Sequence, residues 1–291
     1  MPGRTLVTGA TGFLGRNLVS KLALDGADVT VLQRQGASSG PIVKGLAAQG
    51  AQIVDYGTQE EFREKVVASK FDRVFHLATL YTREHLPSDI GPLIEANIGL
   101  GTQLLDAVVG TECVVVSALS FFQFRHELPA PYSLYSATKE AFTTVARHYR
   151  DVALVDVREV VLYDTFGPGD TRPKLIPHVA RSFANGTPLS LGPSTQLVNL
   201  LFVADVIAGL IAVADGDHSD RVALRAAENV TVLDLVSTFT AVTGRTVEVD
   251  FDQLKPVNDL VTESGDWPAP TGWSSQTSLN DGVSAVWQSL C

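Results

Sequence analysis

A glycine-rich turn close to the N-terminus constrains this chain more than any other feature. The segment TGATGFLG occupies residues 8–15, where Gly9, Gly12 and Gly15 stand three positions apart. An apolar run at residues 5–8 precedes the turn, and residues 13–24 follow with leucines four positions apart, as on one face of a helix. Glycines without Cβ atoms let the backbone approach a pyrophosphate, and the helix start adds N–H donors. Strand, turn and helix together predict a dinucleotide-binding α/β fold.

Strand-like and helical segments alternate through the first half of the chain. The strand-like runs are rich in Val, Ile, Leu and Phe without strict alternation, which is typical of strands buried on both faces of a parallel sheet. Further strands are predicted at residues 29–33, 52–55, 74–78 and 113–117, and the longest helices at 90–109 and 134–150. This order predicts a Rossmann-type, doubly wound parallel sheet over residues 1–166.

The character of the chain changes after the Gly-Pro-Gly segment at residues 167–169. Proline and glycine recur, and residues 167–291 are predicted to form mainly a smaller α/β subdomain that binds substrate, with a strand and helix near 199–214 returning to the first domain. Helices are predicted at 175–184, 204–214 and 232–243, and strands at 200–203, 222–225 and 246–250. Residues 262–278 are expected to form an ordered loop before a last short helix.

The composition argues against several classes of protein. The chain has 32 acidic and 22 basic side chains, a net charge of −10, which argues against binding to nucleic acid or to an anionic membrane. No apolar stretch approaches the roughly 20 residues needed to span a bilayer. The start MPGRTLVTGA has no apolar signal segment, so we expect a cytoplasmic protein. An anionic substrate must therefore meet local positive groups.

The cysteines and histidines predict neither a disulfide framework nor a metal site. Cys113 lies in an apolar run and is expected to be a buried thiol, whereas Cys291 is the last residue. The histidines show no metal-ligand spacing and are expected to be structural or exposed. They are His76, His85, His126, His148, His178 and His218.

A tyrosine and a lysine stand four residues apart in the segment YSATK, within the predicted helix 134–150. The spacing puts Tyr135 and Lys139 on one face of that helix. An ammonium close to a phenol favours the phenolate and is expected to lower the tyrosine pKa from its usual value of about 10. Tyr135 is thus predicted to act as an acid or base near neutral pH.

The G-x-x-G-x-x-G turn and the Y-x-x-x-K pair together resemble the extended short-chain dehydrogenase/reductases, the NAD-dependent epimerase/dehydratase family. The resemblance implies that Lys139 also holds the ribose of a nicotinamide cofactor. It further implies cofactor contacts from the glycine turn, from the end of the third strand, from the turn after the fourth strand and from the helix that follows. The positions are Gly9, Thr11, Gly12, Phe13, Leu14, Gly15, Asp55, Tyr56, Leu77, Ala78, Thr79 and Asn97, besides Tyr135 and Lys139.

The end of the second predicted strand indicates which cofactor is used. An acidic residue there would bind the ribose 2′-OH of NAD and repel a 2′-phosphate. The segment VTVLQRQ instead places Gln33 and Arg34 at that point. Arg34 can pair with a phosphate, so the sequence favours NADP(H). The alternative is an arginine that is merely solvated.

A third catalytic group is expected after the fifth strand, but this chain departs from the family pattern there. The resemblance places Ala118 where a serine or threonine would bind the reacting oxygen, and Ser117 and Ser120 flank it. Either serine, or a group from elsewhere, is expected to take the role, and Ser120 is favoured. Related sugar dehydratases carry T-D-E where this chain has Ala118, Leu119 and Ser120. Because this chain has no aspartate or glutamate in that segment, elimination of water is disfavoured, and hydride transfer or epimerisation is left.

Further segments are similar to those of nucleotide-sugar 4-ketoreductases such as the CDP-abequose and CDP-paratose synthases. They include LYDTFGPGDTRPKLIP at residues 162–177, FFQ at 121–123, LLFVADVIAGL at 200–210 and GWSSQTSLNDGV at 272–283. One departure is Val198, near which the family commonly has an arginine. The resemblance implies reduction of a sugar ketone, most simply at C4, with the proton from Tyr135 and the oxyanion steadied by Ser120 or Thr79.

The resemblance also implies a set of residues around a nucleotide-linked keto sugar. Arg172 and Lys174 are its candidates for the diphosphate, with a solvated basic loop as the alternative. The predicted substrate contacts are Thr79, Tyr81, Ser120, Asp164, Arg172, Lys174, Leu175 and Asn199.

Three rival functions stay open at this point. One is an NAD-dependent sugar epimerase, another is a cofactor-binding protein that has lost catalysis, and the third is a reductase of ketones or aldehydes without a nucleotide. The resemblance also implies a homodimer in which the predicted helices 90–109 and 134–150 pair with their copies in a four-helix bundle.

Overall fold

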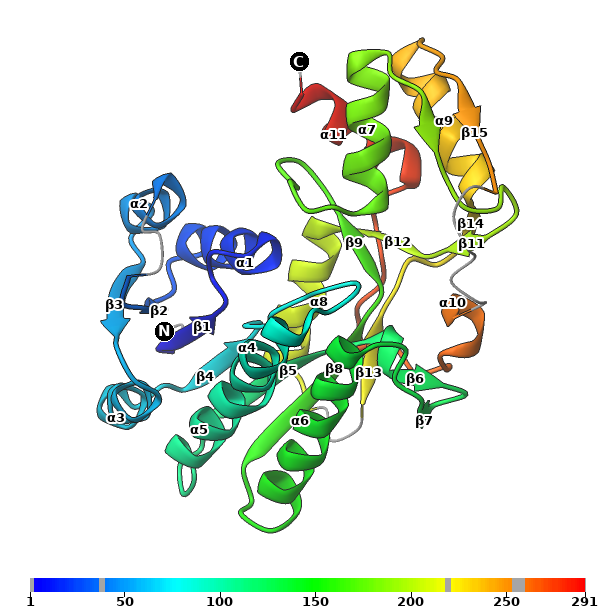
Figure 1. The fold of residues 1–291 in the computed structure, drawn as a ribbon. Coiled ribbons are helices and arrows are strands. Elements are labelled where there is room, and N and C mark those ends of the chain that lie inside the picture. The colour runs from blue at the N-terminus through cyan, green and yellow to red at the C-terminus, as the bar shows by residue number, and fades with distance from the viewer. Residues whose placement is uncertain (1–2, 37–39, 218–220, 253–259, 291) are drawn as a thin grey trace.

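The computed structural model describes residues 3–36, 40–217, 221–252 and 260–290, so that His218 and Cys291 lie outside the described residues. A seven-stranded parallel sheet dominates it, with strand order β13-β8-β5-β4-β1-β2-β3 (Figure 1). Its strands are β1 (Thr5–Thr8), β2 (Val29–Arg34), β3 (Gln52–Tyr56), β4 (Arg73–His76), β5 (Val114–Ser120), β8 (Asp156–Leu162) and β13 (Val222–Leu224). The predicted doubly wound α/β class is confirmed. The strand order reverses between β1 and β4, and the carboxyl ends of strands at such a point are where open α/β sheets bind ligands.

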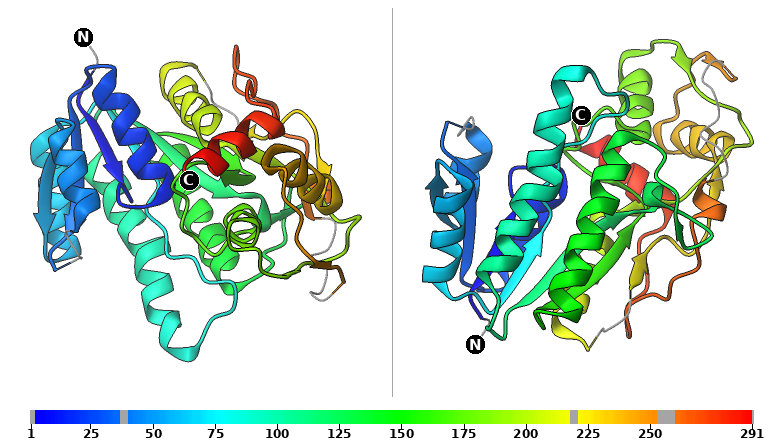
Figure 2. Two further views of the ribbon diagram at one scale, coloured as in Figure 1. Left: turned by 90° about the horizontal axis from the view of Figure 1, so that it is seen from above. Right: turned by 60° about the horizontal axis from the view of Figure 1, so that its bottom comes forward.

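Helices cover both faces of the sheet, as a buried parallel sheet requires. On one face pack α1 (Phe13–Leu24), α2 (Pro41–Ala48) and α8 (Val203–Asp215). On the other lie α3 (Gln59–Ser69), α5 (Leu100–Ala107) and α6 (Leu134–Asp151), with α5 and α6 side by side (Figure 2). Two apolar cores, one on each side, hold these layers to the strands.

A smaller layer of helices and short strands lies at one end of the molecule, at the top of Figure 1. Its helices α7 (Leu175–Asn185), α9 (Val232–Thr243) and α11 (Leu279–Gln288) bury a separate apolar core. Its strand pairs are β10 (Leu189–Ser190) with β15 (Val249–Asp250), and β11 (Leu197–Val198) with β14 (Val230–Thr231). A third pair, β9 (Asp164–Phe166) with β12 (Leu200–Phe202), leads from the large sheet into this layer.

Several expected elements differ in the structure. The run 222–225, expected in the second half's subdomain, is strand β13 of the large sheet, because it pairs with β8. The predicted helix 90–109 is interrupted: a π-helical turn, η2 (Glu95–Gly99), separates α4 (Ile90–Ile94) from α5. The strand expected over 246–250 is reduced to β15. A short helix, α10 (Leu260–Glu263), begins before the predicted loop 262–278 and overlaps its first two residues.

Short elements follow β5 and close the side of the site. They are the 3-10 turn η3 (Phe121–Gln123), β6 (Phe124–Arg125) and β7 (Leu128–Pro129); another 3-10 turn, η1 (Pro87–Asp89), precedes α4. Phe121, Tyr163 and Trp267 belong to an aromatic cluster there.

Burial raises the pKa of the Cys113 thiol to about 12, with smaller effects from Asp72 and Asp156. Across the described ranges, no helix combines the length and the apolar character that crossing a membrane demands.

Candidate active site

The glycine turn packs so tightly that side chains would not fit at two of its positions. Gly9 has a φ of +69°, and a Cβ there would come within 2.6 Å of the backbone nitrogen of Ala78. A Cβ on Gly15 would overlap the carbonyl oxygen of Gly9 and the Cα of Ala10. Gly12 is the N-cap of α1, without a side-chain cap and without an acidic residue in the first turn. The first N–H groups of α1 are therefore not capped by a side chain, which fits a bound pyrophosphate.

A cavity of about 490 Å³ extends from this turn across the ends of β1, β4 and β5; we call it the sheet cavity. Ten of the predicted cofactor residues line it, and a dinucleotide phosphate would thus lie at the start of α1. They are Gly9, Thr11, Gly12, Phe13, Leu14, Gly15, Leu77, Thr79, Tyr135 and Lys139.

The other predicted cofactor residues do not line the sheet cavity. Asn97 is buried, and its amide accepts from Thr79 Oγ1 and the Leu80 N–H and donates to the Leu80 carbonyl and Thr138 Oγ1. All its bonding capacity is used to fix the turn after β4 against α6. The Ala78 N–H donates to Thr8 Oγ1 at 3.2 Å.

The remaining three lie where β2 and β3 end. Arg34 pairs with Glu95 at 2.8 Å, and both side chains are about half exposed. Asp55 accepts a hydrogen bond from the Gln33 amide at 2.6 Å. Tyr56 is buried edge-to-face against Phe62.

Tyr135 projects from the first turn of α6, which Ser133 caps through its hydroxyl. Burial raises the pKa of Tyr135 to about 12, although hydrogen bonds with the side chains of Thr79 and Ser120 and the charge of Arg172 lower it in part. The expectation of a lowered pKa is wrong for this structure, because desolvation of the phenol outweighs its stabilising neighbours. Tyr135 is therefore a neutral phenol near pH 7, able to donate a proton.

Lys139 lies one turn further along α6, fully buried. Its Nζ donates to the carbonyl oxygen of Ala118 at 2.5 Å, and burial lowers the pKa of its ammonium to about 8. His76 lies close by, with Nδ1 2.9 Å from Thr8 Oγ1. Burial, and then the charge of Lys139, lower the pKa of His76 to about 3. The imidazole is thus neutral under ordinary conditions.

The two candidate serines have different surroundings. Ser120 lines the sheet cavity, hydrogen-bonds with the Tyr135 side chain, and accepts from the Phe122 N–H at 3.3 Å. Ser117 is buried, lines neither described cavity, and its hydroxyl has no hydrogen-bond partner in the described part of the chain. The geometry favours Ser120 over Ser117 as the group near the reacting oxygen.

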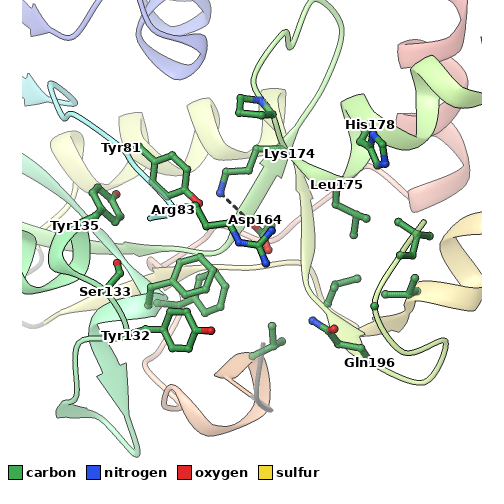
Figure 3. Close-up of a pocket in the computed structure, with 18 of the residues that line it drawn as sticks. Tyr81, Arg83, Tyr132, Ser133, Tyr135, Asp164, Lys174, Leu175, His178 and Gln196 are labelled. Carbon is green, nitrogen blue, oxygen red and sulfur yellow. Dashed lines mark hydrogen bonds and ion pairs between the residues drawn. The ribbon is translucent and has the colours of Figure 1, made fainter. Parts of the chain in front are cut away.

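A second cavity, of about 440 Å³, lies beside the first, between η3 and α7; we call it the α7 cavity (Figure 3). The two cavities share seven wall residues: Tyr81, Phe121, Phe122, Tyr135, Asp164, Pro173 and Lys174. Tyr135 is in edge-to-face contact with Tyr81. Two ligands, one in each cavity, would therefore come together at the wall that contains Tyr135.

The structure separates the predicted substrate residues into four groups by the cavity that they line. Tyr81, Asp164 and Lys174 line both cavities, Thr79, Ser120 and Arg172 line the sheet cavity, and Leu175 lines the α7 cavity. Asn199 lines neither, because its buried amide binds the backbone of Ala226 and the side chain of Asn229.

The two basic residues proposed for the diphosphate face different ways. Arg172 pairs with Asp170 at 2.8 Å and stacks 4.5 Å from the Phe13 ring centre, beside the glycine turn. Lys174 Nζ lies 3.5 Å from Asp164 Oδ1, the pair joined by a dashed line in Figure 3, and 4.7 Å from the Tyr81 ring centre. Lys174 alone of the two lines the α7 cavity.

Sequence reasoning missed much of the α7 cavity wall. Arg83, Tyr132, Ser133, His178, Arg181 and Gln196 all line it. These residues come from separate loops and helices and form no local motif, so no pattern in the sequence brings them together. Among the described residues, no group of three histidine, cysteine, aspartate or glutamate side chains could hold a metal ion.

Comparison with known proteins identifies the family. The model of the NAD dependent epimerase/dehydratase family matches residues 5–224. The chain belongs to this family. This confirms the resemblance to extended short-chain dehydrogenase/reductases that the glycine turn and the Y-x-x-x-K pair carried.

Relatives within the epimerase/dehydratase family include two proteins named for sugar nucleotide chemistry. The chain is 22% identical to the CDP-abequose synthase of Salmonella muenchen, over 96% of this chain and 95% of that one. It is 26% identical to a dTDP-4-dehydro-6-deoxy-D-allose reductase of a Streptomyces species, over 88% and 86%.

Solved structures of the family share the fold. The UDP-glucuronic acid 4-epimerase of Bacillus cereus, in complex with UDP-glucuronic acid and NAD, superposes with a TM-score of 0.85 at 20% identity, over 99% of this chain and 98% of that one. The dTDP-glucose 4,6-dehydratase of Bacillus anthracis, in complex with NAD, gives 0.83 at 18% identity, over 99% and 96%.

Proposed function

We propose that this chain is an NADPH-dependent oxidoreductase that reduces a keto group, at C4, of a nucleotide-linked deoxysugar. One observation carries the proposal: a neutral, buried Tyr135 stands where the glycine-turn cavity meets a second cavity large enough for a ligand. The names of the two curated relatives support a nucleotide sugar as the substrate class.

The sheet cavity fits a nicotinamide dinucleotide. Its glycine turn would take the pyrophosphate, while Tyr135 and Lys139 line the same cavity. A bound NADPH supplies the hydride that the carbonyl carbon receives. Thr79 and Ser120, which share hydrogen bonds with the Tyr135 side chain, orient the phenol for proton donation.

The proton step follows from the properties of Tyr135. A phenol that stays neutral can donate its proton to the carbonyl oxygen as negative charge develops there. Ser120 and Thr79 then support the oxygen from which the proton left. Lys139, held against the Ala118 carbonyl, places a positive charge in the wall of the same cavity while its ammonium is protonated.

We also propose that the cofactor is NADP(H), because β2 ends in Gln33 and Arg34 and has no acidic residue there. Arg34 pairs with Glu95 across an exposed surface, where an ion pair contributes little, about 0–1 kcal/mol. A 2′-phosphate can therefore compete with Glu95 for the guanidinium. We extend the proposal to a cytoplasmic homodimer formed through α4, α5 and α6.

A sugar epimerase is the second candidate. It is favoured by the structural likeness to a UDP-glucuronic acid 4-epimerase and by the acidic Glu95 beside Arg34. An epimerase reduces and reoxidises its nicotinamide within one turnover, so it consumes no cofactor. By the sequence resemblance, Leu119 and Ser120 stand where related dehydratases carry the acidic proton carriers, which argues against a third reaction, elimination of water.

The test is to incubate the protein with 4-keto-6-deoxy sugars linked to dTDP, CDP, GDP and UDP, and to follow NADPH absorbance at 340 nm. We expect stoichiometric consumption of NADPH with at least one substrate and formation of the alcohol. Interconversion of the corresponding 4-hydroxy epimers without net consumption would establish the epimerase instead. Turnover of simple ketones or aldehydes alone would refute the nucleotide-sugar assignment.

A further inference from the structure

The face of α7 that lines the α7 cavity is basic. Lys174 is the N-cap of this helix, and His178 and Arg181 follow at spacings of four and three, so that all three lie along one face. All three line the α7 cavity, whereas Ile176, Val179 and Phe183 on the opposite face are buried in the apolar core. α7 contains no acidic residue.

Arg83 adds a positive charge from a different element, the loop between β4 and η1. Figure 3 shows its side chain extending between Tyr135 on one side and Leu175, His178 and Gln196 on the other. Within the described ranges neither Arg83 nor Arg181 has an ion pair or side-chain hydrogen bond, in contrast to Arg172 and Lys174. Both guanidinium groups are therefore open to a ligand.

The charge in this cavity is opposite to that of the whole chain. The net charge of the chain is −10, yet the cavity wall carries the cations Arg83, Lys174 and Arg181 against the single carboxylate Asp164. Lys174 and Asp164 offset each other, since they lie 3.5 Å apart. The positive charges of Arg83 and Arg181 are then not offset by a carboxylate in the cavity wall. Two guanidinium groups match the geometry and charge of a diphosphate.

We propose that Arg83, from the loop after β4, and Arg181, from α7, bind the two phosphate groups of the substrate in the α7 cavity. This inference rests on the proposed function and names the residues that select a nucleoside diphosphate. Figure 3 shows Arg83 between Tyr135 and Gln196. With the diphosphate at Arg83, the sugar would lie toward Tyr135 and the nucleoside toward Gln196.

The cavity's remaining walls suit the two ends of such a molecule. Phe121, Phe122 and Tyr81 surround the end near Tyr135 with aromatic rings, and a deoxygenated sugar presents apolar surface to them. Leu197 and Val198 line the far end beside Gln196, whose amide can both donate to and accept from the edge of a nucleobase.

The experiment measures binding of UDP, CDP, dTDP and GDP by calorimetry, with saturating NADPH present so that the sheet cavity is blocked. We expect at least one diphosphate to bind, and its parent nucleoside to bind far more weakly. Arg83→Ala and Arg181→Ala are each expected to raise the Kd of that diphosphate about tenfold, as loss of a charged hydrogen bond does, and to leave the Kd of NADPH unchanged. Raising the salt concentration should weaken binding less in the variants than in the wild type.

Lys21→Ala is the matched control, because it removes one exposed positive charge from α1, outside both cavities. It should bind the diphosphate like the wild type. The proposal is overturned if no diphosphate binds to the wild type, or if both arginine variants bind it unchanged. Binding can be measured without turnover. A protein that binds a diphosphate through these arginines but reduces no keto sugar would refute the proposed function and still support the diphosphate-binding proposal.

Discussion

The ammonium of Lys139 lies 2.5 Å from the carbonyl oxygen of Ala118, the residue that the sequence resemblance aligns with the family's serine or threonine. The contact uses the backbone, so the alanine side chain does not disturb it. Position 118 carries no hydroxyl, but Ser120, two residues further along β5, lines the sheet cavity and hydrogen-bonds with Tyr135. Ser120 therefore places a hydroxyl beside Tyr135, while the lysine contact depends only on the backbone of β5.

Replacing Tyr135 by phenylalanine removes the proposed proton donor without removing the ring. We expect kcat for keto-sugar reduction to fall by about 10²–10⁴, the usual contribution of a positioned acid. NADPH binding, followed by fluorescence, should change little because the ring still fills its place beside Tyr81. Tyr132→Phe, in the wall of the α7 cavity, is the control and should keep kcat within a few-fold. Full activity of Tyr135→Phe would remove this residue from the chemistry.

Alanine substitutions at the two serines should have opposite consequences. Ser120→Ala removes a hydrogen bond to the Tyr135 side chain, so we expect kcat to fall by roughly tenfold, the effect of about 1.4 kcal/mol in a neutral hydrogen bond. Ser117→Ala removes a buried hydroxyl that has no partner within the described residues, so kcat should be unchanged and the free energy of unfolding equal or higher. Steady-state kinetics and urea unfolding measure the two effects, and the reverse pattern would assign the role to Ser117.

Much of this site follows from local patterns, and the rest depends on tertiary burial. The glycine turn and the Tyr135–Lys139 pair are each coded within a few residues, so their positions in one cavity could be predicted. The raised pKa of Tyr135 could not, because it arises from the desolvation of a buried ring. Asn97 and Asn199 were predicted as ligand contacts, yet both amides hold loops together, since a sequence position does not reveal where a side chain's hydrogen bonds go. Arg83 and Arg181 line one cavity because the fold brings their elements together there.

Cofactor preference should depend on the Arg34–Glu95 pair at the end of β2. Arg34→Ala removes the guanidinium proposed for the 2′-phosphate, so KM for NADPH should rise about tenfold while KM for NADH changes little. Glu95→Gln frees the guanidinium and removes a carboxylate that repels the phosphate, so KM for NADPH should fall. Steady-state kinetics with NADPH and with NADH give the ratio of the two KM values for each protein. Equal preference for NADH and NADPH in all three proteins would contradict the assignment of NADP(H).

The pH dependence of reduction should come from the lysine and not from the tyrosine. Burial puts the pKa of Tyr135 at about 12, so its proton stays available throughout the working range. Burial lowers the pKa of Lys139 to about 8, so its ammonium is lost as pH rises through that value. We therefore expect kcat to be constant below about pH 7 and to decline above about pH 8. A decline that begins only near pH 10 would show that Lys139 keeps its charge.

His76 should make the folded protein sensitive to acid. Its pKa falls from 6.5 to about 3 on burial, so between these values the unfolded chain binds a proton that the folded chain does not. Stability contributed by the neutral imidazole is complete above pH 6.5 and is lost as pH falls toward 3, by up to about 1.4 kcal/mol per pH unit. His76→Gln keeps a polar group beside Thr8 but cannot titrate, so its free energy of unfolding should be lower at pH 7 and should depend less steeply on pH from 6.5 to 4. Urea unfolding at several pH values measures both slopes.

His85→Gln is the control, because that residue is exposed in the loop before η1 and its substitution should leave the slope as in the wild type. Equal slopes in His76→Gln and the wild type would mean that the imidazole accepts a proton within the fold, and the neutral contact with Thr8 would have to be abandoned.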